Sequence, residues 1–407
     1  MFEPGMVIVG AGKAGARAVI GLREHGWQGA ITLIGEEALP PYDRPPLSKA
    51  SITSESEPTP VLLLDEDTIK SLGATWIGGS PVVAIDRAKR EAGLLDGRRV
   101  AYAKLLIATG AKPRQLSIPG AERAMLLRDF ADTLALRAVF VPGATIVIIG
   151  GGFIGLELAS SAAKRGCKVT VIEALPRILL RGVPEAIADV VAARHRQAGV
   201  TIIPNAKVAG IEADAVILED GRRIEAGILI AGIGAAPAVS LGEASGLAMD
   251  NGIACDDRMR TSDPHIYAVG DCCSFPHPVF GGRRMRLEAW RSATDQAAVA
   301  AENMAGGNKR FEAVPWFWSD QYDLNLQIAG VPEDGTRIVT RTLKDGAFIL
   351  CHLKADGTLV GASGIGRGNS IVRDIKMLEL LIGKQAKPDE AALIDPETQL
   401  RALLKGN

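Results

Sequence analysis

The sequence predicts an α/β protein with two successive βαβ units followed by a terminal α+β module. The first observation is an internal repeat, because residues 6–37 and residues 145–174 share one pattern. Each has a β-branched apolar run, a G-x-G-x-x-G turn, a helix-patterned stretch and a second apolar run that ends in a carboxylate. The second observation is a change near residue 311, where alternating strand-like stretches begin. The repeated strand–helix–strand order indicates parallel sheets, and the alternation indicates a different C-terminal fold.

The three glycines of each repeat have separate tasks in a turn that binds a dinucleotide. The first permits the tight turn, the second lets the backbone approach a pyrophosphate, and the third lets the helix pack on the strand. The helix N-terminus adds free N–H groups and the positive end of its dipole. The glycines are Gly10, Gly12 and Gly15 in the first repeat and Gly150, Gly152 and Gly155 in the second. The alternative is that they are ordinary turn glycines, which the matching contexts disfavour.

A carboxylate follows the second strand of each repeat. Glu36 and Glu173 stand where a ribose diol would be bound in a dinucleotide fold. The negative charge of Glu173 would repel the 2′-phosphate of NADPH, so the second unit is expected to prefer NADH. Arg177 follows closely and leaves that preference open.

Three further segments are predicted to be strands that end in turns of small residues. Residues 104–114 and 227–237 resemble each other, as though each closes one nucleotide-binding unit. Residues 266–271 form a strand that leads into Gly270 and Asp271. Asp271 is either a plain turn residue or a ligand of a cofactor hydroxyl, and we favour the second interpretation.

The C-terminal part is predicted to be an α+β domain. Four alternating stretches indicate strands at residues 325–331, 337–343, 346–353 and 358–363. Residues 370–385 follow with a helical pattern, and the proline-containing residues 313–322 are interpreted as the connection to the rest of the chain.

Length and composition limit the classes of function. A chain of 407 residues has room for two or three domains, and its net charge of −1 gives no global indication of nucleic acid or an acidic membrane. No apolar run approaches the ~18 residues of a membrane span. Strand-like sequence begins at Met6, which leaves no room for a secretory signal peptide, so we expect a cytoplasmic protein.

The cysteines and histidines do not indicate a disulfide framework or a metal site. The five cysteines contain no C-x-x-C pattern, and the five histidines show no ligand spacing. Cys272 and Cys273 are adjacent and are either a redox pair or two buried residues, of which we expect the second.

Several motifs together resemble one family. They are "VGAGKAG" (9–15), "PYDRPPLSKA" (41–50), "IATGAKPR" (107–114), "GGGFIGLELA" (150–159) and "PWFWSDQY" (315–322). In this order and spacing they resemble the FAD-dependent ferredoxin reductases of bacterial oxygenase systems, which have the glutathione-reductase-like fold. The resemblance implies an NADH:ferredoxin oxidoreductase with two Rossmann-type domains. Electrons would pass from NADH to FAD and then singly to a [2Fe–2S] ferredoxin that feeds a cytochrome-type monooxygenase or a Rieske-type dioxygenase.

The resemblance also implies a division into domains. The FAD-binding domain would be discontinuous and comprise residues 1–112 and 238–310. The NADH-binding domain would comprise residues 113–237, and the C-terminal α+β domain residues 311–407.

The resemblance implies the residues of the FAD site. The pyrophosphate would lie on Gly10, Gly12, Ala14 and Gly15, and the adenosine ribose on Glu36. Arg44 would meet phosphate charge, Lys49 the flavin ring, Asp271 the ribitol chain, and Trp290 and Trp318 the isoalloxazine. The remaining lining residues would be Val82, Ala108, Thr109, Gly110, Arg128 and Gly270.

The same resemblance implies the NADH site. Gly150, Gly152, Gly155 and Glu173 would bind the nucleotide, and Glu157 would lie beside the nicotinamide and pair with Lys49. Plainer alternatives remain: Lys49 as a solvated surface lysine, and Glu157 as a carboxylate that complements the helix dipole. Trp316 and Trp318 are assigned to opposite faces of one strand, with Trp318 toward the flavin.

A basic segment is the candidate docking site for the acidic ferredoxin. Residues 281–292 contain Arg283, Arg284, Arg286 and Arg291. A basic patch would steer an acidic partner toward the protein, and a solvated hairpin is the equal alternative.

The sequence disfavours two rival classes of flavoprotein. A flavin disulfide reductase or peroxidase needs a cysteine near the flavin after the first unit, and no cysteine precedes Cys167. An NADH-responsive flavoprotein of the apoptosis-inducing-factor kind would be supported by strong basic character, which the chain lacks. Within the reductases, rubredoxin or a quinone is the alternative electron acceptor.

Overall fold

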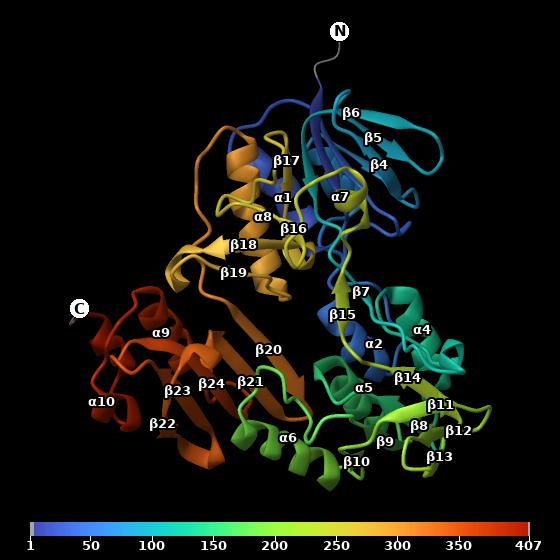
Figure 1. The fold of residues 1–407 in the computed structure, drawn as a ribbon, viewed down its shortest axis with the longest axis vertical. Helices are drawn as coiled ribbons and strands as arrows, with labels where there is room; N and C mark the ends of the chain where they lie inside the picture. The colour runs from blue at the N-terminus through green and yellow to red at the C-terminus, as the bar shows by residue number, and fades with distance from the viewer. Residues whose placement is uncertain (1–3, 406–407) are drawn as a thin grey trace. The chain divides into compact units, whose positions relative to one another are not determined.

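The computed structural model describes residues 4–405, which fall into two compact units (Figure 1). The first unit contains the chain up to Asp43, Pro60–Lys112 and Ala236–Ala313. The second contains Arg44–Thr59, Pro113–Ala235 and the chain from Val314 on. Strands β7 (Ala111–Pro113) and β15 (Ala235–Pro237) lie where the chain passes from one unit to the other.

The first unit is built on a seven-stranded sheet with the strand order β3-β2-β1-β6-β5-β4, to which β17 adds beside β6. The pairs β3/β2, β2/β1, β1/β6 and β6/β17 are parallel, whereas β5 and β4 continue as an antiparallel extension. The strands are β1 (Gly5–Val9), β2 (Ile31–Ile34), β3 (Ala74–Ile77), β4 (Val82–Asp86), β5 (Glu91–Leu94), β6 (Arg99–Ile107) and β17 (Ile266–Ala268).

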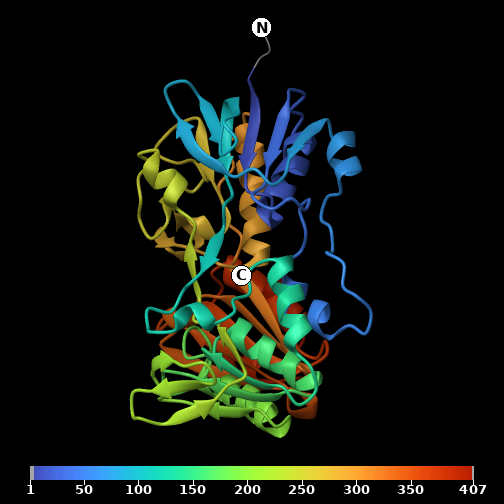
Figure 2. The same cartoon turned by 90° about the vertical axis from the view of Figure 1, so that its right-hand side faces the viewer.

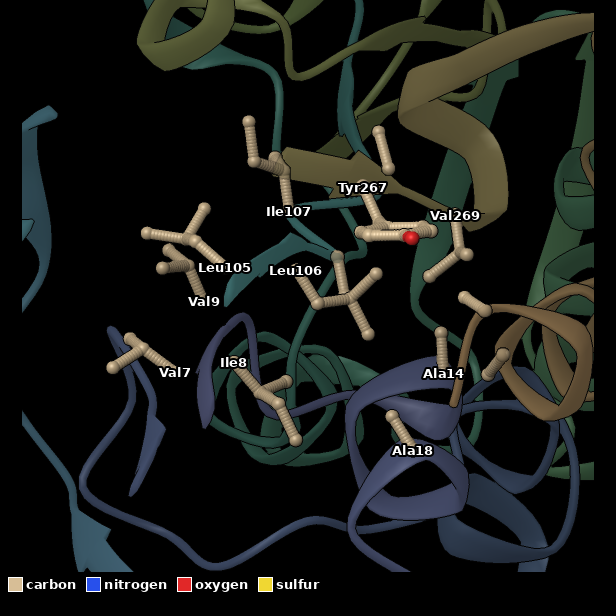
Figure 3. Close-up of a cluster of buried hydrophobic side chains, with 14 of the residues drawn as sticks. Val7, Ile8, Val9, Ala14, Ala18, Leu105, Leu106, Ile107, Tyr267 and Val269 are labelled. Carbon is tan, nitrogen blue, oxygen red and sulfur yellow. The ribbon is translucent and has the colours of Figure 1, made fainter. Parts of the chain in front are cut away.

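The core of this unit forms around strands of continuous apolar sequence, which are buried on both faces of the sheet. Figure 3 shows Val7, Ile8 and Val9 of β1 beside Leu105, Leu106 and Ile107 of β6, with Ala14 and Ala18 of α1 (Lys13–Glu24) nearby. Strands buried on both faces need apolar residues without alternation, and these six side chains are at most 4% exposed.

Helix α8 (Trp290–Met304) packs against α1, and the two helices run side by side in Figures 1 and 2. Small residues make this contact close, because a Cβ built on Gly21 of α1 would lie 2.7 Å from the Cβ of Ala301. The remaining elements of the unit are α3 (Glu66–Ser71), α7 (Ser240–Ala244), β16 (Ile253–Ala254), η3 (Gly270–Cys272), β18 (Cys273–His277), η4 (Pro278–Phe280) and β19 (Arg283–Met285).

The second unit contains three sheets. A four-stranded parallel sheet has the order β10-β9-β8-β14, and a three-stranded antiparallel sheet has the order β11-β12-β13. Their strands are β8 (Thr145–Ile149), β9 (Lys168–Ile172), β10 (Thr201–Ile203), β11 (Val208–Ile211), β12 (Ala215–Leu218), β13 (Arg223–Glu225) and β14 (Ile228–Ala231). The helical elements around them are η2 (Ala121–Arg123), α4 (Phe130–Val139), α5 (Phe153–Lys164) and α6 (Glu185–Gln197).

The third sheet of the second unit is C-terminal, antiparallel and five-stranded, with the order β20-β21-β24-β23-β22. Its elements are β20 (Trp316–Gln321), β21 (Leu324–Gly330), η5 (Pro332–Asp334), β22 (Arg337–Thr342), η6 (Lys344–Gly346), β23 (Phe348–Leu353), β24 (Leu359–Arg367), α9 (Val372–Gly383), α10 (Glu390–Ile394) and η7 (Leu400–Lys405). The segment interpreted from sequence as a connector thus contains β20, which forms one edge of this sheet. Its single proline, Pro315, directly precedes the strand, where it removes no ladder hydrogen bond.

The proline-rich segment 44–59 is held in the second unit by two arginines. It forms η1 (Pro45–Ser48) and the short helix α2 (Ala50–Thr53). Arg137 and Arg165 both donate to the carbonyl oxygen of Ile52, at 2.7 and 3.0 Å. Because these bonds satisfy a carbonyl at the end of a short helix, they fix the segment on α4 and α5.

The sequence-based division into three domains stays a prediction, since the two compact units do not test where the functional domains begin and end. None of the helices in the described part of the chain has the length and apolar character that a membrane crossing requires.

Candidate functional site

The glycine turn of the first unit can be formed only by glycine at two positions. Gly10 has φ = +113°, and a Cβ on it would lie 2.2 Å from the carbonyl oxygen of Ala108. A Cβ on Gly15 would lie 2.0 Å from the carbonyl oxygen of Gly10. Gly12 differs, because a Cβ there would meet no atom within 4 Å. The space beside Gly12 is therefore open to a ligand.

The start of α1 is left without internal partners for its first N–H groups. Gly12 is the N-cap, no side chain caps the helix, and its first turn, which includes Ala14, has no acidic residue. Helix α4 shows the usual solution in the same protein, where Asp129 and Asp132 form a capping box. An uncapped helix start with open space beside it fits an anionic group such as a pyrophosphate.

The glycine turn of the second unit repeats this geometry. Gly150 has φ = +112° with a Cβ position 2.4 Å from the oxygen of Gly232, and a Cβ on Gly155 would lie 2.2 Å from the oxygen of Gly150. Gly152 again has no atom within 4 Å of its Cβ position, and it begins the uncapped helix α5. Both turns therefore fit a dinucleotide.

The carboxylates behind the two turns differ in their surroundings. Glu36 is exposed just beyond β2. Glu173 follows β9 and accepts two hydrogen bonds, from the N–H of Gly151 at 2.7 Å and from that of Leu175 at 2.8 Å. Glu173 is therefore held against its own glycine turn, with its carboxylate beside the backbone that a dinucleotide would approach.

A polar cavity of about 320 Å³ opens beside Glu173. Its lining is charged and polar and consists of Ala174, Asn205, Lys207, Glu219 and Asp220.

Other residues expected at the FAD site also belong to the first unit. Thr109, next to the half-buried Gly110, donates to the carbonyl oxygen of Ala238 at 2.7 Å, and Val82 begins β4. Gly270 has φ = +77°, and its Cβ position would be 3.9 Å from the Cβ of Ala14. The fold therefore brings Gly270, and Asp271 after it, next to the first glycine turn from more than 250 residues away in sequence.

Two residues missed by the sequence analysis surround Trp290. The indole N–H of Trp290 donates to Asp43 at 2.7 Å, and the amine of Lys13 lies 3.8 Å from the ring centroid. Burial lowers the pKa of Lys13, and Asp43 opposes that shift. Lys13 stands inside the glycine motif, so its position was available from sequence. The role of Asp43 was not, because its partner is far along the chain.

In the second unit, Glu157 is the meeting point of three distant segments. Its Oε2 accepts from Ser48 at 2.6 Å and pairs with the Lys49 amine at 2.8 Å. Its Oε1 accepts from Ser319 at 2.6 Å. A carboxylate that is only 7% exposed needs such donors, because an unpaired buried charge is costly. The ion pair between Lys49 and Glu157 that the resemblance implied is therefore present.

The remaining expected site residues also belong to the second unit. The guanidinium of Arg44 donates to the carbonyl oxygen of Arg128 at 2.5 Å. Trp316 and Trp318 stack at 5.4 Å between centroids, so their assignment to opposite faces was wrong. Residues two apart in a strand share a face, and the alternation separates neighbours such as Phe317 from both tryptophans.

The basic segment is less positive than its sequence suggested, because three of its arginines are paired with carboxylates. The pairs are Arg284–Asp250 (3.0 Å), Arg286–Glu288 and Arg291–Asp295 (3.7 Å). Arg283 lies on β19 in the same segment. Its role as a docking surface stays a prediction.

The cysteines are free, and four of the five are buried. Cys272 and Cys273 are not joined to each other, in agreement with the buried interpretation. Burial raises the pKa of Cys272 to about 11 and that of Cys351 to about 12, so the reactive thiolates are disfavoured. In the part of the chain that the structure describes, no three His, Cys, Asp or Glu side chains gather as metal ligands would.

Two family models match the chain. The model described as pyridine nucleotide-disulphide oxidoreductase matches residues 4–297, and the model described as reductase C-terminal matches residues 316–404.

Relatives and solved structures were found over most of the length. The ferredoxin–NAD(+) reductase component of the anthranilate 1,2-dioxygenase system of Burkholderia cepacia is 37% identical over 98% of both chains. A rubredoxin–NAD(+) reductase of Pseudomonas putida is 40% identical over 82% of this chain and 88% of its own. The crystal structure of the covalent putidaredoxin reductase–putidaredoxin complex matches with a TM-score of 0.93 and 33% identity, over 100% of this chain and 99% of that one. The predicted glutathione-reductase-like α/β fold is thereby confirmed.

Proposed function

The chain belongs to the pyridine nucleotide-disulphide oxidoreductase family, and from that premise we propose that it is an FAD-dependent NADH:ferredoxin oxidoreductase of an oxygenase system. The observation that carries the proposal is the pair of glycine turns, one in each unit, with matching backbone geometry and open, uncapped helix starts. Two such turns fit a reaction between two dinucleotides.

The first turn is assigned to FAD and the second to NADH. The FAD contacts proposed in the first unit are Gly10, Gly12, Ala14, Gly15, Glu36, Val82, Ala108, Thr109, Gly110, Gly270, Asp271 and Trp290. For Arg44, Lys49, Arg128 and Trp318, which belong to the second unit, the role toward FAD is proposed from the sequence resemblance alone. When bound, FAD supplies the conversion from the two-electron chemistry of NADH to one-electron transfer.

In the second unit, we assign the pyrophosphate of NADH to Gly150, Gly152 and Gly155. Glu173 takes the ribose diol, and its charge opposes the 2′-phosphate of NADPH. Glu157 lies one turn into the helix that starts at Gly152, and we place it beside the nicotinamide. Its three donors, Ser48, Lys49 and Ser319, hold the carboxylate in place, so that it orients the ring.

The electron acceptor is proposed to be a [2Fe–2S] ferredoxin. The ferredoxin–NAD(+) reductase component from Burkholderia cepacia and the putidaredoxin reductase–putidaredoxin complex support a ferredoxin. Rubredoxin is the second candidate, because a relative of 40% identity is named a rubredoxin reductase. Disulfide reduction is disfavoured, since no cysteine precedes Cys167 and the pKa of the Cys167 thiol is raised by burial. We infer a cytoplasmic location, where NADH is available.

Steady-state reduction of cytochrome c tests this function. The purified holoprotein should reduce cytochrome c with NADH faster when a [2Fe–2S] ferredoxin is added than when rubredoxin is added, and NADPH should be a poor substitute. A rate that no ferredoxin raises would refute the assigned acceptor, and a preference for NADPH would refute the role of Glu173.

A further inference from the structure

A chain of buried polar side chains leads from Glu157 to the last turn of α6, within the second unit. The hydroxyl of Ser319 lies 2.6 Å from Oε1 of Glu157, and Nε2 of Gln321 lies 3.0 Å from that hydroxyl. Oε1 of Gln321 lies 3.0 Å from Nε2 of His195. Ser319, Gln321 and His195 are at most 1% exposed. Strand β20 supplies two of them and α6 the third, beside the α5 helix that carries Glu157 (Figure 1).

The direction of every hydrogen bond from Glu157 to His195 follows from the charge of Glu157. A carboxylate only accepts, so Ser319 donates to it and must accept from the NH₂ group of Gln321. This orients the carbonyl end of Gln321 toward His195, which must then carry its proton on Nε2. The buried Nδ1 of His195 has no partner among the described residues, as expected for a ring nitrogen without a proton. Burial also lowers the pKa of His195 to about 4, so the ring is neutral at physiological pH.

We propose that Ser319, Gln321 and His195 are positioning residues that hold the carboxylate of Glu157 in one orientation for NADH. The proposal rests on the proposed function, in which Glu157 lies beside the nicotinamide. The two oxygens of Glu157 are held differently, because Ser48 and Lys49 bind Oε2 while Ser319 binds Oε1. Without Ser319 the carboxylate could rotate about its Oε2 contacts. Gln321 and His195 act one step further away, by fixing the hydroxyl proton of Ser319 on Glu157.

The same sheet offers a matched control for a purely structural role. His352 of β23 is also buried, its Nε2 lies 3.1 Å from the hydroxyl of Ser363, and burial lowers its pKa to about 4. This second His–Ser pair resembles the first in burial and chemistry, but its bonds do not lead to Glu157. Loss of packing alone should therefore affect the two pairs equally.

The kinetic test follows anaerobic reduction of the bound flavin by NADH in a stopped-flow instrument. Ser319→Ala should lower the limiting rate about tenfold, as expected for the loss of one hydrogen bond to a charged group, while the half-saturating NADH concentration changes by less than about threefold. Gln321→Leu acts through Ser319 and should lower the rate in the same direction but less. Ser319→Thr keeps the hydroxyl and should restore most of the rate. Ser363→Ala and His352→Gln should leave the rate unchanged. Reoxidation of the flavin by ferricyanide should be the same in all variants.

Nitrogen NMR of ¹⁵N-histidine-labelled holoprotein gives a readout that does not depend on turnover. The signals of His195, assigned by their loss in His195→Gln, should show a proton on Nε2 and none on Nδ1. Ser319→Ala should shift these signals and leave those of His352 in place.

The outcomes separate this inference from the proposed function. A wild-type flavin that NADH does not reduce would refute the function, while the NMR experiment would still test the hydrogen bonds from Glu157 to His195. A His195 ring protonated on Nδ1, or His195 signals that Ser319→Ala does not shift, would overturn the inference. So would Ser319→Ala protein that is reduced as fast as wild type, or a loss of rate that Ser363→Ala reproduces.

Discussion

The two glycine turns share their backbone and differ in the side chains that follow. After Gly12 comes Lys13, whose amine lies over the ring of Trp290. After Gly152 comes Phe153, which packs edge-on against Phe317 at 5.0 Å. Glycine therefore gives both turns the same backbone geometry, and the side chains next to each turn determine which ligand it suits. A cation at the first turn favours a tightly held anion, whereas the second turn has Phe153 in the place of that cation and suits a nucleotide that must leave after each turnover.

The largest expected effect comes from adding a methyl group where the backbone has no room. Gly10→Ala and Gly150→Ala each place a Cβ within 2.4 Å of a carbonyl oxygen at a positive φ, so each should cost its own unit several kcal/mol, roughly 3 or more. Gly10→Ala protein should be purified without flavin. Gly150→Ala protein should keep its flavin, as measured by absorbance per mole of protein. The opposite distribution would show that the two turns have been assigned to the wrong nucleotides.

A sharper comparison uses the second glycine of each motif. Gly12→Ala and Gly152→Ala meet no protein atom within 4 Å, so the thermal midpoint of the apoprotein should hardly change. The added methyl group instead fills the space assigned to pyrophosphate. We expect Gly12→Ala to lose FAD and Gly152→Ala to raise the half-saturating NADH concentration at least about tenfold, equivalent to ~1.4 kcal/mol. Unchanged binding of both nucleotides would exclude the open spaces as phosphate sites.

Lowering the pH should destabilise the second unit, because it contains buried histidines whose pKa values are lowered. Burial holds the pKa of His352 at about 4, below the ordinary value of 6.5, so the unfolded chain binds more protons between these values. Stability is therefore present above pH ~6.5 and is lost as the pH falls, by about 2 kcal/mol per histidine at pH ~5. Urea unfolding of wild type and His352→Gln at pH ~6.5 and at pH ~5 measures this loss in the free energy of unfolding. An equal pH dependence in both proteins would contradict a neutral buried His352.

The smallest effect is expected at the residue that distinguishes the first turn. Lys13→Met keeps the length of the side chain and removes its charge, so FAD should dissociate about two- to fivefold more readily, in line with ~0.5–1 kcal/mol for a cation near an aromatic ring or helix end. Fluorescence titration of the apoprotein with FAD measures the affinity. Phe153→Met is the matched control and should leave FAD affinity unchanged. Tighter binding by Lys13→Met would reverse the proposed difference between the turns.

Much of the fold could be predicted because its signals are local. The glycine spacing, the flanking apolar runs and the alternating C-terminal strands each lie within about thirty residues. The assignment of Trp316 and Trp318 to opposite faces applied the period of a strand wrongly. The interpretation of residues 313–322 as a connector gave too much weight to Pro315, which only precedes β20.

The rest of the candidate site depends on contacts between distant segments. Ser48, Glu157 and Ser319 meet across gaps of more than 100 residues, and no local pattern in a single sequence records that meeting. Asp43 beside Trp290 and His195 behind Gln321 were missed for the same reason.

Sequential anaerobic mixing tests the transfer of electrons from NADH through FAD to ferredoxin, because it separates the two steps. Wild-type holoprotein is mixed with one equivalent of NADH, and oxidised [2Fe–2S] ferredoxin is added after the first reaction is complete. We expect NADH to bleach the flavin band, and ferredoxin then to restore it while being reduced itself. Flavin that remains oxidised with NADH, or reduced flavin that passes no electrons to ferredoxin, would refute an NADH:ferredoxin oxidoreductase.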